Sequence, residues 1–217
     1  MLALAGCRVD PPPAPAPTGF FETLEAGSTF HYALFTGENY YDPADTALTY
    51  HPDTLVWEVT AHPEAHVWEV REYLTEGSAS KWGDGPAPWP DSVFTYRLRV
   101  AGDTLFAEAL DPDGWLWSRL FQGHPLPLAP VTDNPATITG WKTDLSYCEC
   151  DRMAHTDQWT LFGKIYYQLN LAILNGWMAV DGPGFTYVYS QQYGLLRSVS
   201  YSWWTQSGVG WDRFPAD

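Results

Sequence analysis

The chain has 217 residues, of which 45% are hydrophobic and 16% aromatic, so it can bury the core of one large domain and is not intrinsically disordered. A formal net charge of −15 argues against nucleic acid as a partner, because the phosphates would be repelled. The same charge argues against adhesion to an anionic lipid surface through basic patches. The sequence holds no run of about 18 apolar residues, so no transmembrane helix is expected.

The N-terminal string Leu4-Ala5-Gly6-Cys7 resembles the lipobox of bacterial lipoproteins. In that motif, small residues let a signal peptidase approach the backbone, and the cysteine thiol receives a lipid. The resemblance implies that residues 1–6 remain from a signal peptide and that Cys7 anchors the protein in the bacterial outer membrane, facing the periplasm or the cell surface. The alternative is an ordinary cysteine, because Met1-Leu2-Ala3 is shorter than the roughly 7–15 apolar residues of a secretory signal.

Residues 7–19 are rich in proline, with Pro11-Pro12-Pro13-Ala14-Pro15-Ala16-Pro17 at their centre. Such a composition favours a stiff polyproline segment, which would hold a domain away from a membrane. We therefore expect a tether over residues 7–19 and a single all-β domain over residues 20–217, beginning at Phe20-Phe21.

Short alternating runs separated by turn residues predict antiparallel strands from Gly27 onward. In the strand expected over Ser28–Thr36, one face carries Phe30, Tyr32 and Leu34. Pro52 is expected to end a short strand at His51, because proline has no N–H for a central ladder. Further strands are expected over Thr54–Ala61, His66–Thr75, Val93–Val100, Thr104–Leu110, Trp115–Phe121 and Ile138–Tyr147.

The segment Trp159–Val180 carries two conflicting patterns. Ile165, Leu169 and Ile173 recur at helical spacing, whereas Gly163 and Gly176 are typical of turns between strands. We predict two strands here, with one short helix as the alternative.

The last strands are expected over Phe185–Tyr189 and Ser198–Trp204. Between them, Tyr193-Gly194-Leu195-Leu196-Arg197 resembles the closing hairpin of periplasmic lipoproteins with LolA-like half-barrel folds. The resemblance implies a curved antiparallel sheet in a protein that binds, carries or scaffolds. Together with the regular turns, it predicts an all-β antiparallel meander that forms a curved half-barrel or barrel.

An irregular segment of Gly, Ser, Pro and Asp residues over Gly77–Asp91 surrounds Trp82 and Trp89. Loops of this length in a compact domain are often functional. Exposed indoles would suit a sugar ring or a protein partner, which makes both residues candidates for ligand or partner binding. The alternative is that both indoles fold back as a lid over the core.

The sequence Cys148-Glu149-Cys150 is the sharpest chemical cluster, with Met153 and His155 just beyond it. On a strand, Cys148 and Cys150 would point to one face and could bind copper or zinc together with His155. A disulfide between Cys148 and Cys150 is a second interpretation, and two inert thiols are a third. A disulfide would need a bent turn, because an extended strand separates these α-carbons by roughly 6.5–7 Å.

Motifs of common hydrolases and of nucleotide-binding loops are absent from the sequence. We therefore expect a protein that is not an enzyme, with no catalytic residue and no cofactor. The favoured function is a membrane-anchored accessory or structural subunit of a cell-envelope protein complex. The alternatives are a ligand carrier or glycan binder that uses the concave sheet or the Trp82/Trp89 loop, and a copper or zinc protein.

Overall fold

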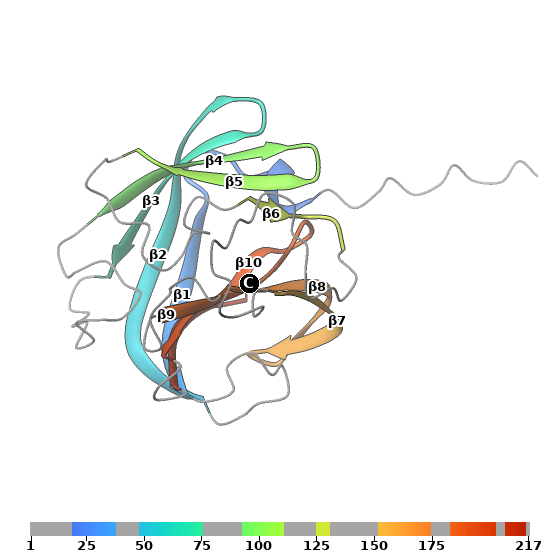
Figure 1. Cartoon of the computed structure of the whole chain (residues 1–217). Coiled ribbons are helices and arrows are strands. Elements are labelled where there is room, and N and C mark those ends of the chain that lie inside the picture. Colours follow the sequence, from blue (N-terminus) through green and yellow to red (C-terminus); the bar gives the residue numbers. More distant parts are fainter. Residues whose placement is uncertain are drawn as a thin grey trace, which may run out of the picture.

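The computed structural model describes residues 19–37, 48–75, 93–110, 125–130, 152–174, 183–202 and 207–215. These residues form one antiparallel sheet of 11 strands that curls into a half-barrel (Figure 1). The predicted all-β antiparallel fold is therefore confirmed. Within the described ranges, no helix is long and apolar enough to cross a membrane.

The elements are η1 (Phe20–Thr23), β1 (Thr29–Gly37), β2 (Thr49–Glu64), β3 (Val67–Leu74), β4 (Phe94–Ala101), β5 (Thr104–Ala109), β6 (Leu126–Pro127), β7 (Arg152–Leu161), β8 (Lys164–Leu174), β9 (Pro183–Ser190), β10 (Gly194–Ser202) and β11 (Ser207–Arg213). The order in the sheet is β6-β5-β4-β3-β2-β1-β11-β10-β9-β8-β7. Two meanders, β1–β6 and β7–β11, thus meet where the first strand pairs with the last.

Alternation along the strands decides which side chains enter the concave side. In β3, Trp68, Val70 and Glu72 are buried, whereas Arg71 between them is exposed. In β1, Tyr32 and Leu34 are buried in the same cluster and Phe30 packs against it, as the alternating pattern predicts.

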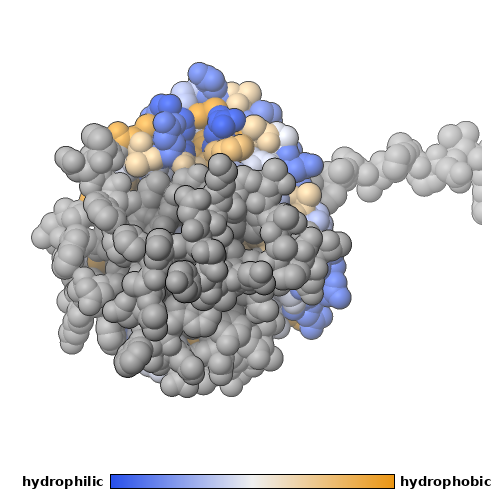
Figure 2. Space-filling model, in the orientation of Figure 1, coloured by the Kyte–Doolittle hydropathy of each residue, from blue (hydrophilic) through white to orange (hydrophobic). Residues whose placement is uncertain are grey.

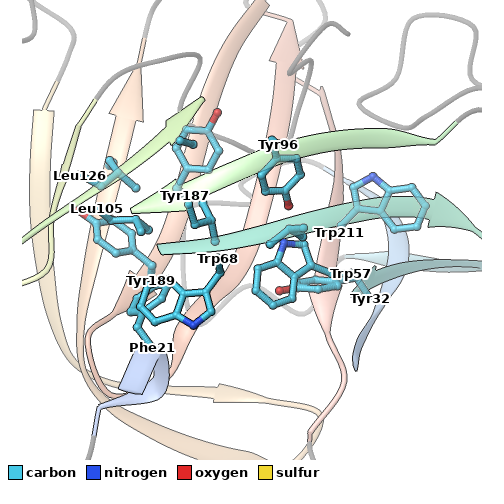
Figure 3. Packing of buried hydrophobic residues seen from close by; sticks show 14 of the residues in the cluster. Phe21, Tyr32, Trp57, Trp68, Tyr96, Leu105, Leu126, Tyr187, Tyr189 and Trp211 are labelled. Carbon is cyan, nitrogen blue, oxygen red and sulfur yellow. The ribbon is translucent and has the colours of Figure 1, made fainter. Parts of the chain in front are cut away.

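Large aromatic side chains fill the concave side of the curled sheet (Figure 3). Trp68 and Tyr96 of the first meander meet Tyr187, Tyr189 and Trp211 of the second, and each is at most 2% exposed. Burying one such side chain stabilises the fold by about 1.5–3 kcal/mol. Because the two meanders share this cluster, the described strands form one cooperative core.

Helix η1 closes one end of this core. The ring of Phe21 lies 6.0 Å from that of Trp68, and the Trp68 indole Nε1–H donates to the Leu24 carbonyl at 3.2 Å. The backbone N–H of Phe20 donates to the Gln191 carbonyl at 2.9 Å, which fixes the start of the described chain beside the β9–β10 turn.

The two edges of the sheet, β6 and β7, are drawn together by side chains. The buried Asn170 amide on β8 donates to the carbonyls of Pro127 and Ala129, at 3.2 and 2.8 Å. Leu126 of β6 and Met153 of β7 belong to the same buried cluster. This seam holds the half-barrel in its curled shape.

A second, smaller core lies on the opposite face of the second meander. Val188 belongs to it, whereas its neighbour Tyr187 belongs to the main core, as expected for adjacent residues of a strand. The members of this outer core are Trp159, Leu161, Tyr166, Leu169, Leu171, Val188 and Leu196. At the tip of the β7–β8 hairpin, the Phe162 ring lies 5.1 Å from Tyr50 and 5.2 Å from Phe214.

Pro52 does not end a strand, contrary to the prediction. Strand β2 runs through it from Thr49 to Glu64. The register against β1 shifts at this point, because Tyr50 pairs with Phe35 but Thr54 pairs with Ala33. Such a bulge accommodates a proline, since it leaves a backbone N–H without a ladder partner in any case.

The segment described up to Leu174 forms two strands, which confirms the favoured interpretation over a short helix. β7 and β8 are joined by a turn in which Phe162 and Gly163 have φ values of 49° and 78°. The helical spacing of Ile165 and Leu169 is misleading, because Ile165 is exposed and Leu169 is buried. An irregular residue between them, Gln168 with φ 55°, changes the face of the strand.

The final strand, β11, was not predicted. Its sequence, Ser207-Gly208-Val209-Gly210-Trp211, lacks a run of large alternating side chains. Gly210 is needed for packing, because a Cβ there would lie 2.6 Å from both Phe35 Cζ and the Ser198 carbonyl oxygen. The strand expected over Ser198–Trp204 is confirmed as far as Ser202 within β10, and Trp203 and Trp204 lie outside the described residues.

Candidate functional site

Most candidate residues from the sequence lie outside the described residues: Cys7, Trp82, Trp89, Cys148 and Cys150. His155 lies on β7, where its Nε2 is 3.1 Å from Gln168 Oε1 and 3.7 Å from Asp157 Oδ1. Among the residues whose positions are described, no three His, Cys, Asp or Glu side chains are grouped to hold a metal ion. The metal and disulfide interpretations therefore stay predictions.

The outer face of β2–β5 carries a hollow of about 470 Å³. Figure 2 shows hydrophilic and hydrophobic residues intermixed over the upper part of the view, where these hairpins lie in Figure 1. The lining residues are Pro63, Glu64, Val67, Arg97, Arg99, Phe106, Ala107 and Glu108. The sequence prediction missed this site, because its residues come from three segments that only the sheet brings together.

Strand register places the charged residues of the hollow in two rows. Arg97 lies directly between Glu69 on β3 and Glu108 on β5. Arg99 lies between Val67 and Phe106 in the same way. Residues directly opposite in antiparallel strands share a face, so both arginines project from the outer side of the sheet.

The two arginines differ in their partners. The Arg97 Nη2 donates to Glu69 Oε1 at 3.0 Å, and this ion pair is partly exposed to water. The Arg99 guanidinium carbon lies 4.3 Å from the centroid of the Phe106 ring, a cation–π contact that orients the side chain. Within the described part of the chain, no hydrogen bond or ion pair occupies the donors of Arg99.

Two carboxylates face the same hollow. Glu64 and Glu108 are exposed, and neither has a hydrogen-bond or ion-pair partner among the described residues. Val67 and Phe106, which face the same side of the sheet as Arg99, add apolar surface to the hollow. Among the described residues, the hollow therefore offers an oriented cation, two carboxylates without partners and an apolar surface, which is an arrangement for binding.

A buried ion pair on the same outer side of the sheet lies between β10 and β11. Arg197 Nε donates to Asp212 Oδ1 at 2.6 Å, and Arg197 Nη2 donates to Oδ2 at 2.5 Å. The Tyr50 hydroxyl also donates to Asp212 Oδ2, at 2.7 Å. The Arg197 guanidinium carbon lies 4.6 Å from the Phe35 ring and 4.7 Å from the Trp159 ring.

This cluster stabilises the structure and is not arranged for acid–base chemistry. Both oxygens of Asp212 are occupied, and burial together with the neighbouring Asp212 charge raises the pKa of Tyr50 above its usual range. A sequence signal for it exists in hindsight. A charged residue follows a large apolar residue at Leu196-Arg197 and at Trp211-Asp212. Because buried charges must be paired, this pattern indicates an ion pair between the two strands.

Comparisons with known proteins found no match to a family model, to a curated protein or to a solved structure.

Proposed function

We propose that this protein is a membrane-anchored lipoprotein that acts as a non-catalytic accessory subunit of a cell-envelope protein complex and contacts its partner through the outer face of β2–β5. The observation that carries the proposal is the hollow on that face, which presents Arg99, Glu64 and Glu108 without partners among the described residues. Free charges around an apolar floor are typical of a surface that binds another molecule.

Because core side chains fill the concave side of the sheet, binding through the outer face is favoured. In half-barrels that carry ligands, the concave side must be hollow enough to hold the ligand. Here Trp68, Tyr96, Tyr187, Tyr189 and Trp211 occupy that side, and all are buried (Figure 3). A carrier that uses the concave sheet is therefore less favoured than a protein that binds through its exterior.

The expected length of the tether also supports the proposal. The described chain begins at Gly19, beside the β9–β10 turn. Just before β1, the Gly27 N–H donates to the Val59 carbonyl of β2, the strand whose last residues, Pro63 and Glu64, line the hollow. A polyproline tether of the expected 7–19 segment spans about 37 Å at roughly 3.1 Å per residue. A partner at the membrane surface would then lie within reach.

Native purification from solubilised membranes tests the proposal, with mass spectrometry of the companion proteins and of the Cys7 peptide. Arg71→Ala is the matched control for Arg99→Ala, because Arg71 lies on the same face but is paired with Glu58 at 2.8 Å. We expect a stoichiometric companion with the wild type and the control, and about a tenfold lower yield of it with Arg99→Ala. A solitary protein would contradict the accessory function, and an unmodified Cys7 would contradict the anchor.

A further inference from the structure

The hollow on the outer face is lined by charged side chains of both signs. Its volume of about 470 Å³ suits a small ligand. Arg99 provides the positive charge, and Glu64 and Glu108 provide the negative charges. All three lie among described residues and have no hydrogen-bond or ion-pair partner there.

The mixed charges exclude ligands of a single sign. An anion bound at Arg99 would also face Glu64 and Glu108, and a polycation bound at the carboxylates would face Arg97 and Arg99. Like charges at such distances are unfavourable. A ligand that carries one anionic and one cationic group satisfies both parts of the hollow.

The sheet register sets the spacing that this ligand must have. Glu64 and Arg99 lie on either side of Val67, two strand spacings apart, or roughly 10 Å between α-carbons. Arg99 and Glu108 are diagonal neighbours, at roughly 7–8 Å. An extended peptide of two or three residues covers about this distance, at roughly 3.3–3.6 Å per residue. The charges of a single amino acid share one carbon and are too close together.

We infer that the hollow binds a short peptide with both termini free, with its carboxylate on Arg99 and its ammonium group on Glu64 or Glu108. The Phe106 ring already orients the Arg99 guanidinium group. A bidentate contact with a carboxylate therefore loses little further side-chain conformational entropy. Val67 and Phe106, on either side of Arg99, supply the apolar surface beneath the peptide backbone. This inference goes beyond the proposed function and rests on that function only for its setting in the cell envelope.

The test is an NMR titration of the full chain with triglycine at low ionic strength, where screening is weak. The amide signals of Glu64–Val67, Arg97–Arg99 and Phe106–Glu108 should shift together. N-acetyl-triglycine and triglycine amide should each bind about fivefold more weakly, because each lacks one charge. Arg99→Ala should weaken binding about tenfold, whereas the control Arg71→Ala should leave it unchanged.

Other results would overturn the inference. These are an absence of shifts at the hollow, binding of either blocked peptide as tight as that of triglycine, and an equal loss in Arg71→Ala. O-phosphoethanolamine serves as a competing probe, and tighter binding of it than of triglycine would assign the hollow to a lipid headgroup. Triglycine binding without a companion in the native purification would remove the proposed function and leave this inference. A companion protein in the native purification, without triglycine binding, would remove this inference and leave the proposed function.

Discussion

Arg197 and Asp212 face each other across β10 and β11 in a bidentate ion pair that is almost entirely excluded from water. The aromatic rings of Phe35 and Trp159 lie against the guanidinium group. The pair on β10 and β11 thereby contacts both β1, the neighbour of β11, and β7, at the edge of the sheet.

Breaking this pair should be strongly destabilising. We expect Arg197→Met to lower the free energy of unfolding by about 3–5 kcal/mol, because it leaves Asp212 buried without its counter-charge. Combining it with Asp212→Leu should recover most of the loss, since a buried ion pair can often be replaced by apolar residues. Urea unfolding followed by tryptophan fluorescence measures both. A single variant that costs less than about 0.5 kcal/mol would contradict the assignment.

The Tyr50 hydroxyl should contribute separately to the same cluster. Tyr50→Phe removes its hydrogen bond to Asp212 and keeps the ring contact with Phe162. We expect a loss of about 1 kcal/mol, because the partly exposed site lets water replace the hydroxyl. Tyr73→Phe is the control, since its hydroxyl makes only a longer bond, 3.3 Å, to Glu58. Equal losses in the two variants would show that the ion pair does not need Tyr50.

Alkaline pH should unfold the protein through its buried tyrosines. Burial raises the pKa of Tyr189 above its ordinary value of 10.0, so the folded state keeps a proton that the unfolded state loses. The unfolded state then binds fewer protons, and stability is unchanged below about pH 10 and falls above it. Tyr189 alone contributes a slope of about 1.4 kcal/mol per pH unit. Urea unfolding at pH 8 to 11.5 measures this slope, and Tyr189→Phe should reduce it. An unchanged slope in that variant would count against the burial effect.

The seam between the sheet edges should depend on Asn170. Asn170→Ala removes its bonds to the carbonyls of Pro127 and Ala129, and we expect a cost of about 2 kcal/mol. Hydrogen exchange should also become faster in β6, because this short strand otherwise pairs only with β5 in the described sheet. Gln168→Ala, which loses exposed bonds to Asp157 and His155, should cost less than about 0.5 kcal/mol. Unaltered exchange in β6 would mean that the seam is held by packing alone.

Much of the fold could be predicted from local patterns. Alternation of apolar and polar residues predicted β1, β3, β4 and β5, because side chains on a strand repeat every two residues. Gly102-Asp103 predicted the β4–β5 turn, because glycine supplies the positive φ that such turns need. The position of Pro52 was misjudged for the opposite reason. A bulge depends on how β2 pairs with β1, and nothing within β2 itself indicates it.

The sequence by itself thus determined the all-β class and the positions of most described strands, because these follow from local alternation and turn chemistry. Only the tertiary structure decided that β1 pairs with β11, that Arg197 meets Asp212, and that Glu64, Arg99 and Glu108 surround one hollow. Each of these depends on strand register between distant segments. Register is set by which side chains can be buried together across the whole sheet, and no single stretch of sequence contains that information.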